Sequence, residues 1–270
     1  MTNLFSVKDN VIVLTGGSGI LGASMVHHFA EQGAKVVILD KNEATGKALQ
    51  DAVCANGGEA WFLYSDVLNK EVLEQNYTDI MAKYGRIDVL INGAGGNMPG
   101  ATIAPDKTIF DLEIEAFKRV VDLNLFGTIL PSMVFSKAMV EQKKGSIINI
   151  ASESAIRPLT RVAGYGTAKA AVVNFTKYLA GELATKFWEG LRVNAIAPGF
   201  FLTEQNRNLL TNPDGSLTDR AKTIIAHTPF RRFGEPDELL GTVQWLASDA
   251  SKFVTGTLTV IDGGFDAFSI

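Results

Sequence analysis

Residues 15–22 read Thr15-Gly16-Gly17-Ser18-Gly19-Ile20-Leu21-Gly22, and they join a short apolar run, Val11–Leu14, to an amphipathic pattern, Leu21–Gln32. Within them Gly17, Gly19 and Gly22 match the spacing G-x-G-x-x-G. Glycines at this spacing allow a tight turn and a close approach of the backbone to a pyrophosphate, which then lies on a helix N-terminus. The pattern predicts either a dinucleotide-binding turn or a glycine-rich strand-to-helix turn without a ligand.

Short β-branched runs alternate with longer amphipathic stretches along the whole chain. The candidate strands are Val11–Leu14, Lys35–Leu39, Ala60–Tyr64, Val89–Asn92, Ser146–Ile150, Arg192–Ile196 and Leu258–Ile261. The amphipathic stretches include Leu21–Gln32, Glu43–Asn56, Lys70–Tyr84, Ile114–Val140, Ala163–Phe187 and Pro236–Ala247. This alternation predicts an α/β fold, a parallel sheet with helices on both faces. The runs lack a polar alternation, as expected for strands buried on both faces.

The composition limits the class of protein. The chain has 270 residues, 46% of them hydrophobic, and a net charge of −4. A chain of this length buries enough surface to fold without disulfides, and the lone Cys54 fits a reducing compartment. We therefore expect one domain, residues 1–270, in the cytoplasm. Cys54, His27, His28 and His227 form no metal-ligand pattern, no basic block indicates nucleic acid, and no run approaches the roughly 18 apolar residues of a membrane helix.

Two long segments interrupt the alternation. Gly93–Lys107 is rich in glycine and proline, and Pro198–Arg232 carries the turn cluster TNPDGS. Both follow predicted strands, and open α/β sheets bind ligands at the carboxyl ends of their strands. Long irregular segments in a compact domain are usually functional. We expect a substrate loop or lid at about 198–232.

Acidic residues end the second and third candidate strands. A carboxylate at Asp40, about 20 residues after the glycine turn, is placed to accept hydrogen bonds from an adenosine ribose and to repel a 2′-phosphate. NAD is therefore favoured, and NADP stays open because Lys41 softens that repulsion. Asp66 either contacts the adenine end or caps a helix.

Four polar residues suggest acid–base chemistry. Tyr165 and Lys169 lie at i and i+4 of a predicted helix, on one face. A neighbouring ammonium favours a phenolate and is expected to lower the tyrosine pKa, so that Tyr165 exchanges a proton with a substrate oxygen. Ser152 ends the fifth candidate strand and is expected to donate to the same oxygen. Asn124 is expected to anchor a water relay to Lys169.

Together with the glycine turn, these residues resemble the short-chain dehydrogenase/reductase family. The matching segments are TGGSGILG (15–22), Asp66–Val67, NGAG (92–95), LNLFG (123–127), NIAS (149–152), YGTAK (165–169), NAIAPG (194–199) and VTGTLTVIDGG (254–264). The resemblance implies a doubly wound Rossmann-type domain with a seven-stranded parallel sheet. It also implies a catalytic tetrad in which Tyr165 is the acid/base, Ser152 polarises the carbonyl, Lys169 holds the nicotinamide ribose, and Asn124 supports the proton relay.

The resemblance also implies a cofactor site. Its residues are Gly16, Gly17, Ser18, Gly19, Ile20, Leu21, Asp40, Lys41, Asp66, Val67, Asn92, Ala94, Gly95, Tyr165, Lys169, Pro198, Gly199, Phe201 and Thr203. Two positions depart from the family pattern: Ile20 stands where the middle glycine of the turn is usual, and Gly93 stands in the usual NNAG. The role of each glycine is therefore left open.

Polar and cationic residues near the expected mouth indicate the substrate. The candidates are Asn97, Ser154, Arg157, Arg161, Gln205 and Arg207. Arginine suits carboxylates, so the site favours a sugar acid. The loops NGAGGNMPGAT (92–102) and PGFFLTEQNR (198–207) also resemble the subgroup of D-mannonate oxidoreductases (fructuronate reductases), which implies interconversion of D-mannonate and D-fructuronate.

Other readings stay open. A gluconate 5-dehydrogenase or another polyol dehydrogenase has the same motifs, whereas a 3-oxoacyl reductase would normally use NADP. From a different class, a non-catalytic NAD(H)-sensing regulator would keep the scaffold, although it has no need for a matched acid–base pair. The family usually pairs the helices at Ile114–Val140 and Ala163–Phe187 across a two-fold axis, so the resemblance implies a homotetramer or homodimer.

Overall fold

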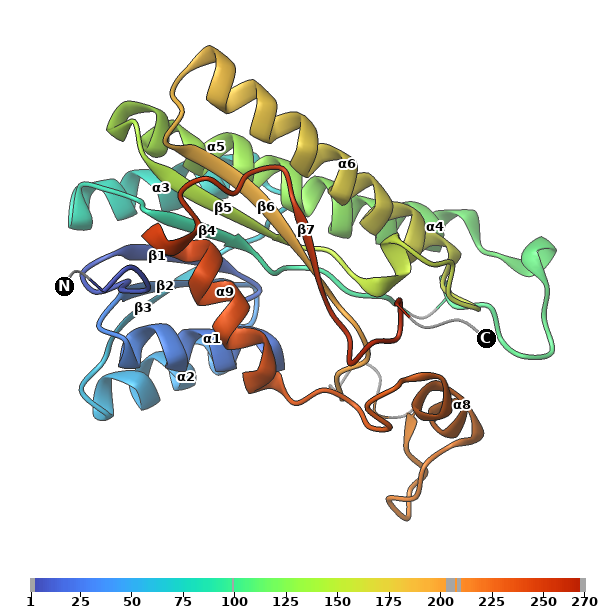
Figure 1. Cartoon of the computed structure of the whole chain (residues 1–270). Helices are drawn as coiled ribbons and strands as arrows, with labels where there is room; N and C mark the ends of the chain where they lie inside the picture. The colour runs from blue at the N-terminus through green and yellow to red at the C-terminus, as the bar shows by residue number, and fades with distance from the viewer. Residues whose placement is uncertain (1–2, 99, 203–206, 208–209, 268–270) are drawn as a thin grey trace.

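The computed structural model describes residues 3–98, 100–202, 207 and 210–267. Its centre is a seven-stranded, all-parallel sheet in the order β3-β2-β1-β4-β5-β6-β7 (Figure 1). The strands are β1 (Val11–Thr15), β2 (Lys35–Asp40), β3 (Glu59–Tyr64), β4 (Val89–Asn92), β5 (Gly145–Ile150), β6 (Leu191–Pro198) and β7 (Leu258–Ile261). The predicted doubly wound α/β fold is confirmed, with every predicted strand present.

Helices cover both faces of this sheet (Figure 1). On one face, α1 (Ile20–Glu31), α2 (Glu43–Ala55) and α9 (Leu240–Ala247) bury apolar side chains such as Phe29, Leu49 and Val243. On the other, α3 (Lys70–Tyr84), α5 (Gly127–Gln142) and α6 (Ala163–Lys186) bury a second cluster that includes Phe135. Two cores explain the strand composition, because strands such as β1 and β6 are buried along their whole length.

The long stretch predicted at Ile114–Val140 has an internal change of winding. It divides into α4 (Ile114–Val121), a single wide π turn at Asp122–Phe126, and α5. Such turns occur often at functional sites, and this one carries Asn124. By length and composition, Ile114–Gln142 could cross a membrane. It packs on β4, β5 and α3, so we interpret it as a core helix.

Helix α8 (Asp219–His227) was not predicted; it lies within the segment expected to be irregular. Its buried Ala221 and Ile224 join a small apolar cluster with Leu159 and Phe265. Figure 1 shows α8 beyond the carboxyl ends of the strands, away from the two helical layers. Part of the fold therefore extends over the edge of the sheet where the candidate site residues gather.

Candidate active site

The glycine turn is held tightly against the loop after β4. Gly16 has a left-handed φ of 67°, and a Cβ there would lie 2.8 Å from the Cα of Ala94. Thr15 Oγ1 accepts hydrogen bonds from the amides of Gly93 and Ala94, both at 3.2 Å. Because only glycine tolerates both the backbone conformation and the close approach, Gly16 fixes the turn.

The first turn of α1 is open to an anion. The helix begins at Ile20, its N-cap Gly19 offers no side-chain cap, and no acidic residue stands in the first turn. Free amides and the positive end of the helix dipole therefore face out from the turn, as an anion site requires. Ile20, where the family pattern has glycine, lines a cavity of about 480 Å³ with Leu202, Arg207 and Phe233.

The acidic residues after β2 and β3 have different partners. Asp40 accepts from the backbone amides of Ser18 and Asn42, each at 3.0 Å. Lys41 Nζ lies 3.0 Å from a carboxylate oxygen of Asp66. Burial acts to raise the pKa of Asp66, but the hydrogen bond from the Leu68 amide and the contact with Lys41 outweigh burial and lower this pKa. Asp66 does not cap α3, since Asn69 does. The charge that was expected to soften repulsion at Asp40 is thus engaged elsewhere.

Asn124 and Lys169 flank the same glycine. Asn124 is fully buried, donates to Gly96 O at 2.7 Å and accepts from Gly96 N at 3.0 Å. A Cβ on Gly95 would lie 2.6 Å from Asn124 Oδ1 and 3.2 Å from Lys169 Nζ. Lys169 Nζ donates to Ile150 O at 2.7 Å. The π turn, the loop after β4 and α6 therefore converge, and the two predicted tetrad members are brought together.

Ser152 and Tyr165 are also brought together, but the pKa of the phenol differs from the expectation. Burial raises the pKa of Tyr165, and the only opposing effect is a hydrogen bond from Ser152. Burial also lowers the pKa of Lys169 to about 8. The predicted lowering of the tyrosine pKa by Lys169 is therefore wrong for this structure: the lysine Nζ lies 5.7 Å from the ring centroid and binds a backbone carbonyl.

Ser154 acts on Ser152 in this arrangement. Its backbone amide and its hydroxyl lie 3.2 and 3.0 Å from Ser152 Oγ, and both donate to it. A serine hydroxyl has one proton and two lone pairs. With both lone pairs occupied, the single proton of Ser152 is left for Tyr165 or for a substrate oxygen.

Glu153, which the sequence analysis did not single out, is the unusual residue of this region. Its side chain is only 1% exposed, and neither carboxylate oxygen has a partner among the described residues. Burial, then the charges of Asp266 and Asp262, raise its pKa to about 7, against an opposing effect of Arg157. The available signal was a charged residue next to Ser152, at the carboxyl end of a buried strand.

The predicted cofactor-lining residues do not all present side chains to the edge of the sheet. Asn92 donates into the core, to Ser132 Oγ at 2.9 Å and Asn149 Oδ1 at 2.8 Å, while its Oδ1 has no partner. Phe201 is buried in the core, where its ring packs against Gly234. The remaining positions lie in the glycine turn or at strand ends: Gly17, Ser18, Leu21, Val67, Ala94, Pro198 and Gly199.

The substrate candidates have separate surroundings. Arg157 is engaged by the C-terminal segment, since its Nε donates to Asp266 Oδ1 at 2.7 Å and its Nη2 to Asp266 O. Asn97 donates to Thr102 Oγ1 at 2.6 Å and keeps a buried, unpartnered Oδ1. Arg161 Nε donates to Ile103 O, and Arg207 is exposed. Thr203 and Gln205 lie outside the described residues.

Comparisons with known proteins identify the family. A family profile described as "Enoyl-(Acyl carrier protein) reductase" matches residues 17–266. The "Uncharacterized oxidoreductase UxuB" of Bacillus subtilis (strain 168) is 44% identical over 98% of this chain and 97% of its own length. The chain belongs to the short-chain dehydrogenase/reductase family, whose members are oxidoreductases that act on alcohol and ketone groups with NAD(P).

Two solved structures share the fold closely. One is a "putative D-Mannonate oxidoreductase" from Haemophilus influenza with bound NAD, with a TM-score of 0.91, 37% identity and coverage of 99% of both chains. The other is a gluconate 5-dehydrogenase from Burkholderia cenocepacia J2315 in complex with NADP and tartrate, with a TM-score of 0.88, 29% identity and coverage of 98% of both chains.

Proposed function

We propose that this chain is an NAD(H)-dependent oxidoreductase that interconverts a secondary alcohol and a ketone on a sugar acid, with D-mannonate and D-fructuronate as the first pair. The observation that carries the proposal is the hydrogen bond from Ser152 to Tyr165, with Lys169 and Asn124 gathered around Gly95 at the same edge of the sheet. A proton donor, its polarising neighbour and a buried cation in one place are what carbonyl reduction requires.

The residues present fit a dinucleotide. The uncapped first turn of α1 suits a pyrophosphate, and Asp40 suits an adenosine ribose with a free 2′-hydroxyl. Since Lys41 is paired with Asp66, no cation among the described residues pairs with Asp40 to offset repulsion of a 2′-phosphate, which favours NAD over NADP. When bound, the nicotinamide accepts or delivers a hydride at its C4 carbon.

The chain's own residues handle the proton. Tyr165 Oη gives a proton to the carbonyl oxygen in reduction and takes one from the hydroxyl in oxidation. Ser152 donates a hydrogen bond to that oxygen, because Ser154 occupies its lone pairs. Lys169, held by Ile150 O, places a cation beneath the site. The two bonds between Asn124 and Gly96 hold the loop after β4 in place.

Two observations support a sugar acid as the substrate: the similarity to a solved structure and the polar side chains of the site. The similar Haemophilus structure carries the name of a D-mannonate oxidoreductase and binds NAD. Asn97 and Ser154 bring amide and hydroxyl groups to the site, which suit a polyhydroxylated substrate better than an acyl chain or a steroid. A gluconate 5-dehydrogenase is the second candidate, favoured by the solved relative that holds NADP and tartrate.

The test is a spectrophotometric screen at the nicotinamide absorbance. D-Mannonate, D-gluconate and D-mannitol are offered with NAD and NADP, and D-fructuronate with NADH and NADPH. We expect D-mannonate with NAD to give the highest kcat/KM, at least about tenfold above D-gluconate, as differential binding in a shaped site allows. A higher value for D-gluconate would select the second candidate. Tight NADH binding without turnover of any substrate would instead indicate a sensing regulator.

A further inference from the structure

Two arginines from different segments meet at the carboxyl edge of the sheet. Arg161 lies in the segment before α6, and Arg220 lies in the first turn of α8. The guanidinium of Arg220 donates from Nη1 to Thr160 Oγ1 at 2.9 Å and from Nη2 to Thr160 O at 3.4 Å. Arg220 is therefore fastened to the residue next to Arg161, close enough for the charge of Arg161 to act on it.

Neither arginine has an anionic partner within the described part of the chain. Among the described residues, Arg161 donates only from Nε, to Ile103 O at 2.8 Å, which leaves the fork of its two terminal nitrogens without an acceptor there. Nearby arginines behave differently, since Arg157 pairs with Asp266 and Arg232 with Glu238. Arg157 and Arg232 are thus neutralised by carboxylates, whereas no described carboxylate pairs with Arg161 or Arg220.

The local arrangement is electrostatically unfavourable without an anion. Burial first, and then the charge of Arg161, lower the pKa of Arg220. Arg220 also lies at the positive end of the α8 dipole, where a cation is disfavoured. Arg161 has a left-handed φ of 77°, which a non-glycine residue adopts only where its surroundings impose it.

The two arginines have fixed positions relative to the candidate active site. Arg161 is four residues before Tyr165 in sequence, and its backbone carbonyl accepts from Ile103 N at 3.0 Å, which ties it to the loop after β4. Leu159 packs against the apolar cluster that holds Ala221 and Ile224 of α8. The segment before α6, the loop after β4 and α8 are therefore fastened together around this pair.

We propose that Arg161 and Arg220 together bind the carboxylate of the substrate, and so select acids over neutral polyols. The proposal rests on the oxidoreductase function proposed above. The free fork of Arg161 suits a bidentate contact with two carboxylate oxygens, and Arg220 adds a second cation from α8. Because Arg220 belongs to α8, an acid substrate also strengthens the attachment of α8 to the edge of the sheet.

The test compares Arg161→Gln and Arg220→Gln with the unmodified chain, using D-mannonate and the neutral polyol D-mannitol. We expect KM for D-mannonate to rise about 10- to 100-fold, as for loss of a hydrogen bond to a charged group, while kcat changes by less than about threefold. The preference for D-mannonate over D-mannitol falls by the same factor. Arg220→Lys keeps the charge without the fork and is expected to lie between.

The matched control is Lys222→Gln, which removes a cation from the same helix, where it pairs with Asp219 on the exposed surface. It should leave KM for D-mannonate unchanged. An unchanged KM in both arginine variants, or equal use of D-mannitol by the unmodified chain, would overturn the carboxylate site and leave the oxidoreductase function standing.

A second measurement keeps the inference testable without turnover. Calorimetry of D-mannonate binding to the NADH-loaded chain, in which substrate and cofactor are both reduced and cannot react, is expected to show binding that Arg161→Gln weakens about 10- to 100-fold. Equal binding by the variant, or none by the unmodified chain, contradicts the proposal. Thermal melts of both arginine variants establish that they are folded.

Discussion

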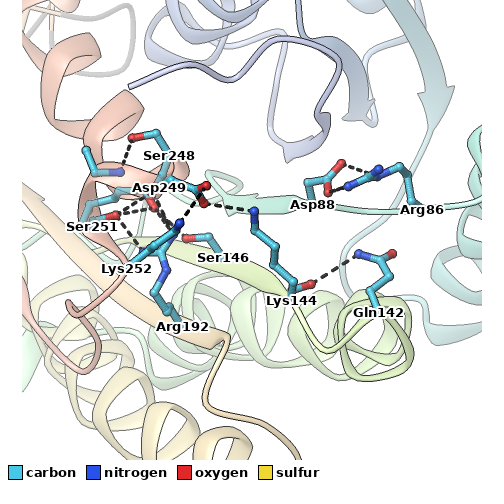
Figure 2. A network of polar contacts seen from close by, with 12 residues as sticks. Arg86, Asp88, Gln142, Lys144, Ser146, Arg192, Ser248, Asp249, Ser251 and Lys252 are labelled. Carbon is cyan, nitrogen blue, oxygen red and sulfur yellow. Dashed lines mark hydrogen bonds and ion pairs between the residues drawn. The ribbon is translucent and has the colours of Figure 1, made fainter. Parts of the chain in front are cut away.

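The two edges of the sheet differ in whether their polar side chains have hydrogen-bond or ion-pair partners. At the amino edge, polar side chains bind one another, and Figure 2 shows Arg192 beside Ser248 and Ser251. Arg192 donates to Ser251 Oγ and to the carbonyls of Leu246 and Ser248. Asp88 binds Arg86 and accepts from Val11 N, while Lys144 and Lys252 share Asp249 (Figure 2).

At the carboxyl edge, several groups are left without partners. Both oxygens of Glu153 and one oxygen of Asn97 are buried and unpartnered among the described residues, and the charges of Arg161 and Arg220 repel each other. Buried polar groups without partners are costly. The contrast indicates that the amino edge contributes to stability, and that the carboxyl edge keeps donors and acceptors for ligands.

The largest expected effect is a loss of activity when a residue of the carboxyl edge, Tyr165, is changed. Tyr165→Phe removes the only proton that the phenol exchanges, so kcat should fall by about 10³- to 10⁴-fold, the upper range for general acid–base catalysis. The Kd for NADH, measured by fluorescence titration, should stay within about twofold, because the ring remains. Turnover near that of the unmodified chain would remove Tyr165 from the proposed chemistry.

The next effect belongs to the amino edge and should appear in stability alone. Arg192→Met removes three charge-assisted hydrogen bonds from a side chain that is only 8% exposed. We expect a loss of about 3 kcal/mol in the free energy of unfolding, measured in urea, with kcat unchanged in the folded fraction. Lys252→Met, which removes an exposed partner of Asp249, is the control and should cost less than about 0.5 kcal/mol. A large fall in kcat for Arg192→Met would contradict the prediction that Arg192 affects stability alone.

The sequence predicted the sheet, and it predicted that Ser152, Tyr165, Lys169 and Asn124 lie together, but it did not predict the electrostatics of these residues. Strands such as Val11–Leu14 are recognisable because burial on both faces leaves an uninterrupted apolar run. Helix α8 was missed because its nine residues include few apolar ones and follow a turn cluster. The π turn around Asn124 does not interrupt the helical periodicity, so the pattern gives no sign of it.

Contacts between distant residues explain the remaining differences. The pairing of Arg157 with Asp266 joins positions 109 apart in the chain, and no local pattern encodes it. The pKa of Tyr165 is raised because the ring is buried, and the degree of burial is known only once α6 is packed. Spacing predicted which residues meet, whereas desolvation and backbone acceptors such as Ile150 O determine their charge states.

A smaller effect tests whether the buried Glu153 at the carboxyl edge lowers the free energy of unfolding. The pKa of Glu153 is raised to about 7, above its value in an unfolded chain, so the native state holds this proton more tightly. Stability from this group is present at low pH and is lost as pH rises from about 4.5 to 7, by at most about 3 kcal/mol. Glu153→Gln should therefore match the unmodified chain at pH 5.

At pH 8 the same variant should be more stable by about 2 kcal/mol, because no charge is formed near Asp262 and Asp266. Urea unfolding at both pH values measures the difference, and Arg157 stays in place in both proteins. A difference that is equal at pH 5 and pH 8 would show that Glu153 is not the titrating group.

The smallest effect compares one serine from each edge. Ser154→Ala removes one of the two donors to Ser152 Oγ, so the proton of Ser152 is no longer confined to Tyr165 or the substrate oxygen. We expect kcat to fall about tenfold with little change in KM. The pH profile of kcat/KM should move to higher pH, because the bond from Ser152 lowers the pKa of Tyr165.

The control at the amino edge is Ser146→Ala, which removes a hydroxyl that binds Leu246 O. This variant should lower the free energy of unfolding by about 1 kcal/mol without moving the pH profile. If both variants shift the profile equally, the hydroxyl of Ser154 has no particular role, and the two edges do not differ in the way proposed.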